Sequence, residues 1–296
     1  MEDYRKYLDP QVLARLEGLP LRARRIVEGY VSGLHRSPFR GFSIEFAEHR
    51  EYTPGDDLRY LDWKVFGRTD KYYLKQFEEE TNLICHLVLD SSESMTYRSD
   101  RAAMSKLDYA RSAAAALAYL VLRQQDSVGL AVFDDSVRAL VRPSSNPSHL
   151  EQVCGAMIQA ATNRKTATGT VFHELAERMK KRAIVAIFSD LFDSAEHALA
   201  GLKHFRHRRH DVVLFHVLDP AELEFPFEGT TRFRGLEGAA AMVVEPRGLR
   251  QAYLTEFGRF RRRLREGCRG RGIDYVLLRT DKPLDVALTG FLTARR

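Results

Sequence analysis

The sequence has no apolar run long enough to cross a lipid bilayer. Its longest apolar stretch, around residues 113–122, is much shorter than the roughly 20 residues that a membrane-spanning helix needs. The N-terminal segment MEDYRKYLDP is charged and lacks the apolar core of a secretory signal. We therefore expect a soluble, cytoplasmic protein without a membrane span.

Cysteine is scarce, and the commonest catalytic motifs are missing. Cys85, Cys154 and Cys268 lie far apart and form no C-x-x-C pair, so neither a disulfide framework nor a thiolate zinc site is indicated. The sequence contains no P-loop, and no G-x-S-x-G elbow surrounds Ser92 or Ser94. The sequence therefore gives no indication of a P-loop nucleotide-binding protein or of a serine hydrolase.

Basic residues outnumber acidic ones, giving a formal net charge of +6. Much of the excess lies at 203–210 (KHFRHRRH) and 258–272 (GRFRRRLREGCRGRG). Such runs usually form the solvated faces of helices, and arginine stems can cover apolar neighbours. No nucleic-acid-binding signature accompanies them. Nucleic-acid binding is therefore only an alternative, resting on charge alone, and the role of both clusters stays open.

Residues 81–296 alternate apolar, strand-like runs with helical stretches. Strands that are apolar on both faces and separated by helices predict a mostly parallel sheet covered on both sides. We expect a doubly wound α/β domain. The runs SVGLAVFD and SVRALVRP, joined at Asp134 and Asp135, predict a hairpin within it. Residues 219–248, rich in Pro and Gly, are expected to form an insertion.

Residues 1–80 differ from the rest and are expected to form an N-terminal extension of helices and a small β region. Residues 10–34 read as basic helix, whereas 42–52 and 71–80 alternate like strands. Between the latter lies PGDDLRYLDWKVFGR, which predicts a short helix with Asp56 as its N-cap and Gly67 at its end.

Polar side chains follow two predicted strands of the α/β domain. Asp90 closes the run LICHLVLD and Asp190 closes AIVAIFSD, and ligands of open parallel sheets gather at such strand ends. Ser92 and Ser94 follow Asp90 at alternate positions, and Thr170 precedes a predicted helix. An all-oxygen set with few charges suits Mg²⁺, with Mn²⁺ or Ca²⁺ as substitutes. An ordinary turn without chemistry remains the alternative.

The segments LVLDSSESM, TGTVFHEL and AIFSD resemble, in this order, the metal-ion-dependent adhesion site of von Willebrand factor type A domains. The resemblance assigns Asp90, Ser92 and Ser94 to the first motif, Thr170 to the second and Asp190 to the third. TGT stands where the family more often has GGT.

Residues 33–82, GLHRSPFRGFSIEFAEHREYTPGDDLRYLDWKVFGRTDKYYLKQFEEETN, closely resemble the bacterial domain of unknown function 58 family, which joins this stretch to a type A domain. The resemblance covers nearly the whole chain. It implies a partnership with a MoxR-type AAA+ ATPase in protein maturation, together with a client protein that the sequence does not name.

Three functions compete on this basis. The first is a non-enzymatic, magnesium-dependent adaptor, in which an acidic group of the partner completes the shell of the ion. The second is a phosphotransferase that uses Asp90 as a nucleophile, although Ser92 stands where the haloacid-dehalogenase pattern has its second acid. The third is nucleic-acid binding through the arginine clusters. We favour the adaptor and expect no enzymatic activity.

Four further residues are candidates for partner contact. Glu93 is the charged residue of the DSSES loop that the metal shell does not use, so it can face a partner. Arg59, Asp62 and Trp63, the only tryptophan, form a second candidate surface. The competing interpretation, which we favour, places Trp63 in the core and pairs Arg59 with an acid such as Asp62.

Overall fold

The structure is a computed structural model that describes residues 44–53, 61–79, 83–160, 168–192, 194–233, 241–284 and 286. The predicted helix at 10–34 and Arg59 lie outside these residues. The chain divides into two compact units, one formed by Gly29–Asn82 and the other containing Leu83–Arg296.

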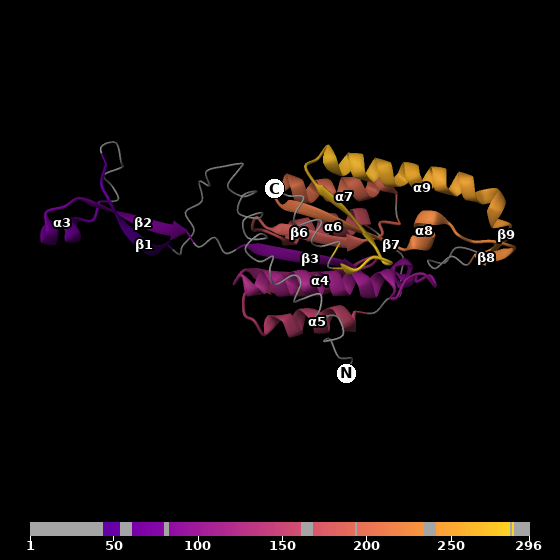
Figure 1. The fold of residues 1–296 in the computed structure, drawn as a ribbon, viewed down its shortest axis with the longest axis horizontal. Coiled ribbons are helices and arrows are strands. Elements are labelled where there is room, and N and C mark those ends of the chain that lie inside the picture. The colour runs from indigo at the N-terminus through magenta and orange to yellow at the C-terminus, as the bar shows by residue number, and fades with distance from the viewer. Residues whose placement is uncertain are drawn as a thin grey trace. The chain divides into compact units, whose positions relative to one another are not determined.

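The smaller unit contains a hairpin-like pair of strands and a short helix. Strand β1 (Ile44–Glu51) pairs antiparallel with β2 (Tyr73–Glu79), as the alternating sequence predicted, and α3 (Trp63–Thr69) lies between them in the chain (Figure 1). The helix does not begin or end where the sequence predicted. Its N-cap is Asp62, whose carboxylate accepts hydrogen bonds from the amides of Lys64 and Val65, so it satisfies the free N–H groups of the first turn.

The larger unit is built on one six-stranded sheet in the order β10-β7-β6-β3-β4-β5. All neighbours are parallel except β4 and β5, which form the predicted hairpin. The strand bounds are β3 Ile84–Asp90, β4 Ser127–Phe133, β5 Val137–Ser144, β6 Ile184–Ser189, β7 Asp211–Leu218 and β10 Asp274–Arg279. The predicted α/β fold with a mostly parallel sheet is confirmed.

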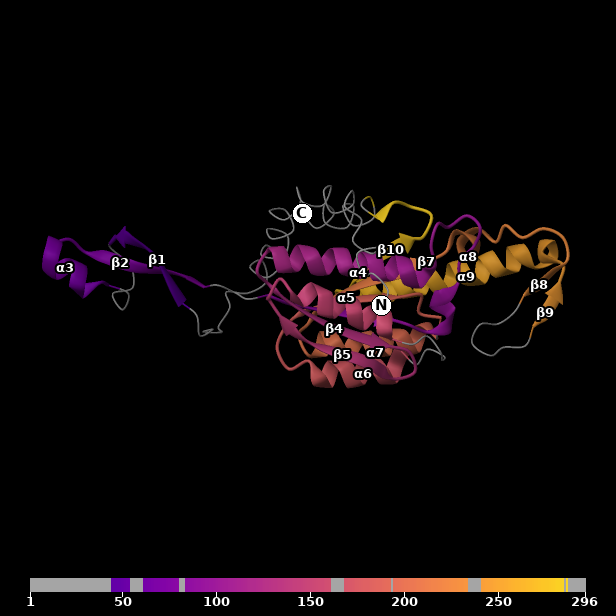
Figure 2. The same ribbon diagram turned by 90° about the horizontal axis from the view of Figure 1, so that it is seen from below.

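Helices cover both faces of this sheet (Figures 1 and 2). Helices α4 (Lys106–Arg123) and α5 (His149–Gln159) lie on one face. The other face carries α6 (Thr168–Arg178), α7 (Ala195–His207) and α9 (Pro246–Arg269). Successive residues of β3 point to opposite sides, so Leu87 and Leu89 join one hydrophobic cluster and Val88 joins the other.

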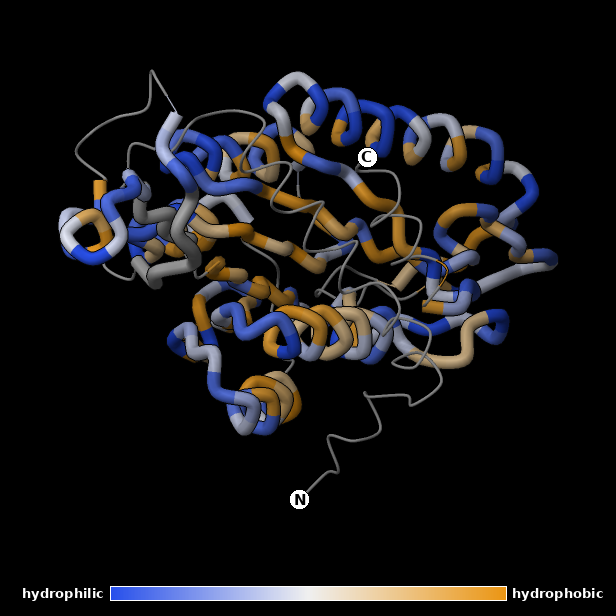
Figure 3. The backbone as a smooth tube through the Cα atoms, turned by 60° about the vertical axis from the view of Figure 1, so that its left-hand side comes forward, coloured by the Kyte–Doolittle hydropathy of each residue, from blue (hydrophilic) through white to orange (hydrophobic). Residues whose placement is uncertain are grey.

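The hydropathy of the chain follows this layering. Hydrophobic residues concentrate in the strands and on the inner sides of the helices, whereas α9 is hydrophilic over much of its length (Figure 3). The segment 219–248 contains α8 (Pro220–Glu224) and a two-stranded sheet of β8 (Thr231–Phe233) and β9 (Met242–Val244). None of the helices in the described part of the chain is long and apolar enough to span a membrane.

The strand order places a switch point between β3 and β6. From β3 the chain proceeds to β4 on one side, whereas β6, β7 and β10 follow on the other side. The helices that follow two such strands leave toward opposite faces, which opens a crevice at the carboxyl ends of the strands. Asp90 is the last residue of β3, and Asp190 directly follows β6.

Candidate functional site

The turn after β3 brings Asp90, Ser92 and Ser94 together. The amide of Ser92 donates to Asp90 Oδ1 at 2.9 Å, and the hydroxyls of Ser92 and Ser94 are 3.0 Å apart. Ser91 turns the other way, since its hydroxyl donates to the carbonyl of Phe133. A short 3₁₀ helix, η3 (Glu93–Thr96), begins directly after Ser92. The alternate positions of the DSSES loop thus gather on one side.

Asp90 is completely buried, and its hydrogen bonds come from neutral groups. Ser189, at the end of β6, donates from Oγ to Asp90 Oδ2 at 2.5 Å, while Oδ1 accepts the Ser92 amide. Burial and the negative charge of Asp190 raise the pKa of Asp90 to about 7, although the hydrogen bonds from Ser189 and Ser92 oppose this shift. A cation beside Asp90 would favour its charged form.

Asp190 is also completely buried, but it is paired with an ammonium group. Lys106 Nζ donates to Asp190 Oδ2 at 2.7 Å and to Glu222 Oε1 at 2.6 Å. The other carboxylate oxygen of Asp190 accepts the amide of Phe192 at 3.2 Å. Burial alone would lower the pKa of Lys106, but the two carboxylates raise it above its ordinary value. Lys106 is therefore a charged partner of Asp190.

The sequence prediction missed Lys106, Glu222 and Ser189. Lys106 is the first residue of α4, directly after its N-cap Ser105. A cation at this end of a helix is unfavourable because the helix dipole is positive there. This misplaced lysine was the available signal. Glu222 lies in α8, which follows β7 in the sequence. No feature of the sequence around it indicated a contact with Lys106.

Thr170 is exposed, unlike the other four predicted metal ligands. It lies in the first turn of α6, which begins at Thr168, and Thr168 is the completely buried threonine of this segment. The preceding residues 161–167 are outside the described part of the chain. The structure thus brings Asp90, Ser92 and Ser94 together. Asp190 is near enough for its negative charge to repel that of Asp90, and its own partner is Lys106.

The donor set fits a hard, oxygen-preferring cation in part. Asp90, Ser92 and Ser94 offer one carboxylate and two hydroxyls from a single turn, which suits an ion that keeps several waters, as Mg²⁺ does. Asp190 fits less directly because Lys106 occupies one of its oxygens. In the described residues, no group of three or more His, Cys, Asp and Glu side chains could hold a metal, so hydroxyls and waters would have to supply most of the shell.

The second candidate surface separates into a structural residue and an exposed one. Asp62 is 6% exposed and caps α3, whereas Trp63 is 66% exposed. The favoured interpretation of Trp63 as a core residue is therefore wrong. Its indole meets Phe66 edge-on, with ring centroids 6.2 Å apart, and the rest of the ring faces outward. Glu93 is partly exposed at the start of η3.

The two basic clusters lie mainly on α7 and α9, and several of their side chains are paired. Arg208 pairs with Glu177, Arg259 with Glu256, and Arg263 with Glu196. The His204 ring lies against His173 of α6, with their Nδ1 atoms 3.4 Å apart.

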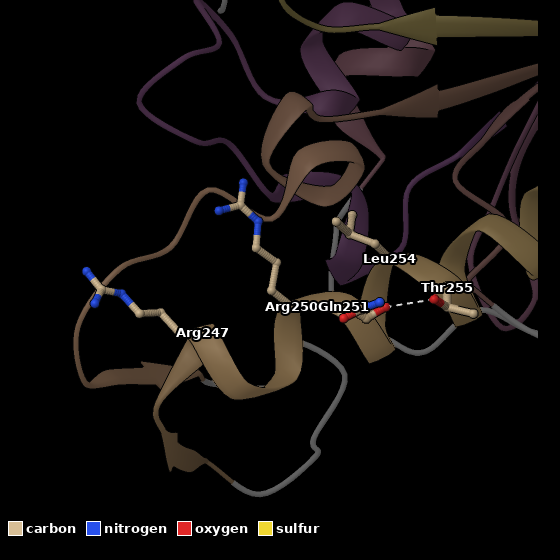
Figure 4. Close-up of a pocket in the computed structure, with 5 residues that line it drawn as sticks. All are labelled: Arg247, Arg250, Gln251, Leu254 and Thr255. Carbon is tan, nitrogen blue, oxygen red and sulfur yellow. Dashed lines mark hydrogen bonds between the residues drawn. The ribbon is translucent and has the colours of Figure 1, made fainter.

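A separate shallow pocket of about 420 Å³ lies along the first half of α9 (Figure 4). Its lining residues are Arg247, Arg250, Gln251, Leu254 and Thr255. The Arg250 guanidinium donates to the carbonyl of Glu224 at 3.3 Å. The pocket includes none of the predicted metal ligands.

Several solved structures resemble the chain only weakly. A conserved hypothetical protein, BatB, from Bacteroides thetaiotaomicron is 17% identical, with a TM-score of 0.44, over 72% of this chain and 98% of that one. An aerotolerance-related membrane protein from Bacteroides fragilis is also 17% identical, with a TM-score of 0.43, over 72% of this chain and 99% of its own.

Similarity in sequence extends along nearly the whole chain. Uncharacterized proteins of Mycobacterium bovis and Mycobacterium tuberculosis are 27% identical to it over 298 aligned residues, covering 97% of this chain and 91% of theirs. Residues 48–263 match the family described as "Protein of unknown function DUF58". The match covers well over half of the chain, and the chain belongs to this family.

Proposed function

We propose that the chain is a non-enzymatic adaptor that binds a partner protein through a divalent cation at the carboxyl ends of the central strands of its sheet. The ion is Mg²⁺, with Mn²⁺ or Ca²⁺ as substitutes. Asp90, Ser92 and Ser94 hold it directly, and Asp190 and Thr170 complete the shell, in the manner of the metal-ion-dependent adhesion site of von Willebrand factor type A domains. The observation that carries the proposal is the convergence of the first three side chains in one buried turn.

The electrostatics of the turn support a cation there. Asp90 is buried near Asp190, and both effects raise its pKa to about 7. Its hydrogen-bond donors are neutral and include the Ser92 amide and the Ser189 hydroxyl. A divalent cation would offset the repulsion between the two carboxylates, which is the usual way in which a buried carboxylate is kept charged.

The surroundings of Asp90 argue against the phosphotransferase alternative. A nucleophile has to reach the phosphorus atom of its substrate, but the Asp90 side chain is completely buried and both of its oxygens accept hydrogen bonds. Ser92, which stands in place of a second acid, is bonded to Ser94. These contacts suit a residue that holds an ion better than one that attacks a phosphate ester.

The partner proposed is a MoxR-type AAA+ ATPase together with a client protein. Two carboxylates leave a divalent ion short of anionic ligands, so an acidic side chain of the partner can complete the shell and make the affinity depend on the metal. We propose that the complex acts in the cytoplasm, where such an ATPase would find its ATP. Neither the client nor the oligomeric state follows from the chain.

Two serine variants test the proposal with matched chemistry. Ser92→Ala removes a proposed ligand, whereas Ser91→Ala removes a buried hydroxyl that is bonded away from the site. Calorimetric titration with Mg²⁺ should show weaker binding for Ser92→Ala and for Asp90→Asn but not for Ser91→Ala. Capture of the ATPase on immobilised protein should require Mg²⁺ and fail in EDTA. Equal Mg²⁺ affinity of all variants, or equal capture in EDTA, would overturn the proposal.

A further inference from the structure

Lys106 is a charged side chain that the fold buries completely. It has no exposed surface and is among the largest fully buried side chains of the described residues. Its ammonium lies 4.7 Å from the centre of the Phe192 ring and 5.9 Å from that of Tyr97. Removing an ammonium from water is costly unless carboxylates compensate it, and here Asp190 and Glu222 both do so.

The ammonium occupies an oxygen that a metal would need. Asp190 Oδ2 accepts from Lys106, while Asp190 Oδ1 accepts the Phe192 amide. Oδ2 keeps a second lone pair, but an ion bound there would lie close to the positive ammonium and be repelled by it. Asp190 therefore joins the shell of an ion most favourably when Lys106 releases it. Glu222 gives the ammonium a second place to stay, because its Oε1 already accepts from Lys106. Its Oε2 is bound to the amide of Asp219, which fixes this carboxylate in position.

The charges of the site divide unevenly. The Lys106 ammonium pairs with the carboxylates of Asp190 and Glu222, whereas Asp90 interacts with the negative charge of Asp190. Asp90 receives hydrogen bonds from neutral groups of Ser189 and Ser92, including the Ser189 hydroxyl and the Ser92 amide. The side of the site around Asp190 and Glu222 thus already has its cation, whereas the side around Asp90 is open to one.

We propose that Lys106 is a built-in cation of the site, which competes with the divalent metal for Asp190. This inference rests on the proposed function, since it concerns the same metal position. Without metal, Lys106 is shared between Asp190 and Glu222. When a divalent ion binds at Asp90, Lys106 withdraws to Glu222 and frees Asp190 Oδ2. Lys106 therefore sets the affinity of the site and makes metal binding depend on a carboxylate outside the D-x-S-x-S loop.

Replacement of Lys106 by an uncharged residue should strengthen metal binding. In Lys106→Met both Asp190 and Glu222 lose their cation. A divalent ion then binds these carboxylates without competition from an ammonium group. Titration with Mn²⁺, followed by calorimetry and by the paramagnetic signal of the free ion, should show binding at least tenfold tighter than in wild type. Lys180→Met removes the same charge from an exposed position and should leave the affinity unchanged.

A second variant covers the case in which Lys106→Met does not fold. Glu222→Gln keeps an oxygen for the helix cap but removes the negative charge that shares Lys106 with Asp190. The ammonium then stays on Asp190, and Mn²⁺ binding should weaken at least threefold. Glu224→Gln makes the same substitution two positions along, at a residue paired with Arg101 and Arg279, and serves as its control.

The outcomes separate the two proposals. If wild type binds Mn²⁺, Asp90→Asn does not, and neither Lys106→Met nor Glu222→Gln changes the affinity, the competition is refuted while the metal site stands. If wild type binds no Mn²⁺ but Lys106→Met does so through Asp90, the competition is supported in its strongest form. If none of these proteins binds Mn²⁺, both proposals fail.

Discussion

Ser189 Oγ donates a hydrogen bond to Asp90 Oδ2 at 2.5 Å, which joins the carboxyl ends of β6 and β3. The same hydroxyl oxygen accepts the amide of Leu191 at 2.9 Å. Leu191 has a positive φ of 50° and is completely buried, so the turn after β6 is held in an unfavourable backbone conformation. One hydroxyl therefore supports both the buried carboxylate and the turn that contains Asp190.

Ser189→Ala should destabilise the larger unit. The substitution leaves a buried carboxylate oxygen and a buried amide without partners, and a loss of this kind costs about 2 kcal/mol. Urea unfolding followed by near-ultraviolet circular dichroism measures the change. Ser145→Ala, at an exposed position, is the control and should change the free energy of unfolding very little. Equal stability of the two variants would show that the Ser189 bond contributes nothing.

Asp62→Ala should affect the stability of α3, whereas Trp63→Ala should affect partner binding. Asp62 caps α3 through the amides of Lys64 and Val65, and loss of such a cap costs about 1 kcal/mol. Hydrogen exchange at these amides should accelerate roughly fivefold in Asp62→Ala. Trp63 is 66% exposed, so Trp63→Ala should leave this protection intact and, if the proposed ATPase contacts this surface, weaken its capture. Unchanged capture by Trp63→Ala would remove the second candidate surface.

A pH-dependent loss of stability is expected from His86. Burial, followed by the neighbouring charge of His210, lowers the pKa of His86 from 6.5 to about 4. Between these pH values His86 is protonated in the unfolded chain but neutral in the folded chain. The free energy of unfolding therefore falls as the pH falls from about 6.5 to about 4. The contribution of His86 over this range is at most about 3 kcal/mol.

The measurement compares wild type with His86→Gln. Asp90, whose pKa is raised to about 7, acts in the opposite direction over this pH range, and buried His216, whose pKa is lowered to about 4, acts in the same direction. The profile of a single protein therefore mixes several effects. The difference in the free energy of unfolding, wild type minus His86→Gln, isolates His86. This difference should fall as the pH is lowered from 7 to 4. His207→Gln, at an exposed position, should follow the wild-type profile. Parallel profiles of His86→Gln and wild type would contradict the assignment.

The sequence predicted the sheet well because its strands are buried on both faces. All eight residues of β7 are buried, and all but Asp211 and His216 are apolar, so the strand has apolar residues on both faces, unlike a surface strand. The D-x-S-x-S turn was predictable for a similar reason, since its geometry is local. Ser92 and Ser94 converge within three residues of chain, and Ser91 turns away from them.

The charged surroundings of this turn could not be predicted from local patterns. Lys106 is 84 residues from Asp190 and 116 from Glu222 in sequence, and only the packing of α4, β6 and α8 brings them into contact. The predicted N-cap of α3 was wrong for another reason. Both Asp56 and Asp62 are good N-cap residues, and the local sequence does not determine which one the helix uses.

Glu93→Gln should alter partner binding without altering metal binding. Glu93 is partly exposed at the start of η3, and its backbone carbonyl, which accepts the Thr96 hydroxyl at 2.7 Å, is untouched by the substitution. The loop therefore keeps its shape while one negative charge beside the proposed ion is removed. If Glu93 repels acidic groups that approach this ion, Glu93→Gln should capture acidic partners more tightly, by roughly threefold to tenfold at low salt. Calorimetry with Mg²⁺ should give the wild-type affinity in parallel. If capture and its salt dependence stay at their wild-type values, Glu93 is a solvated loop residue without a role in partner choice.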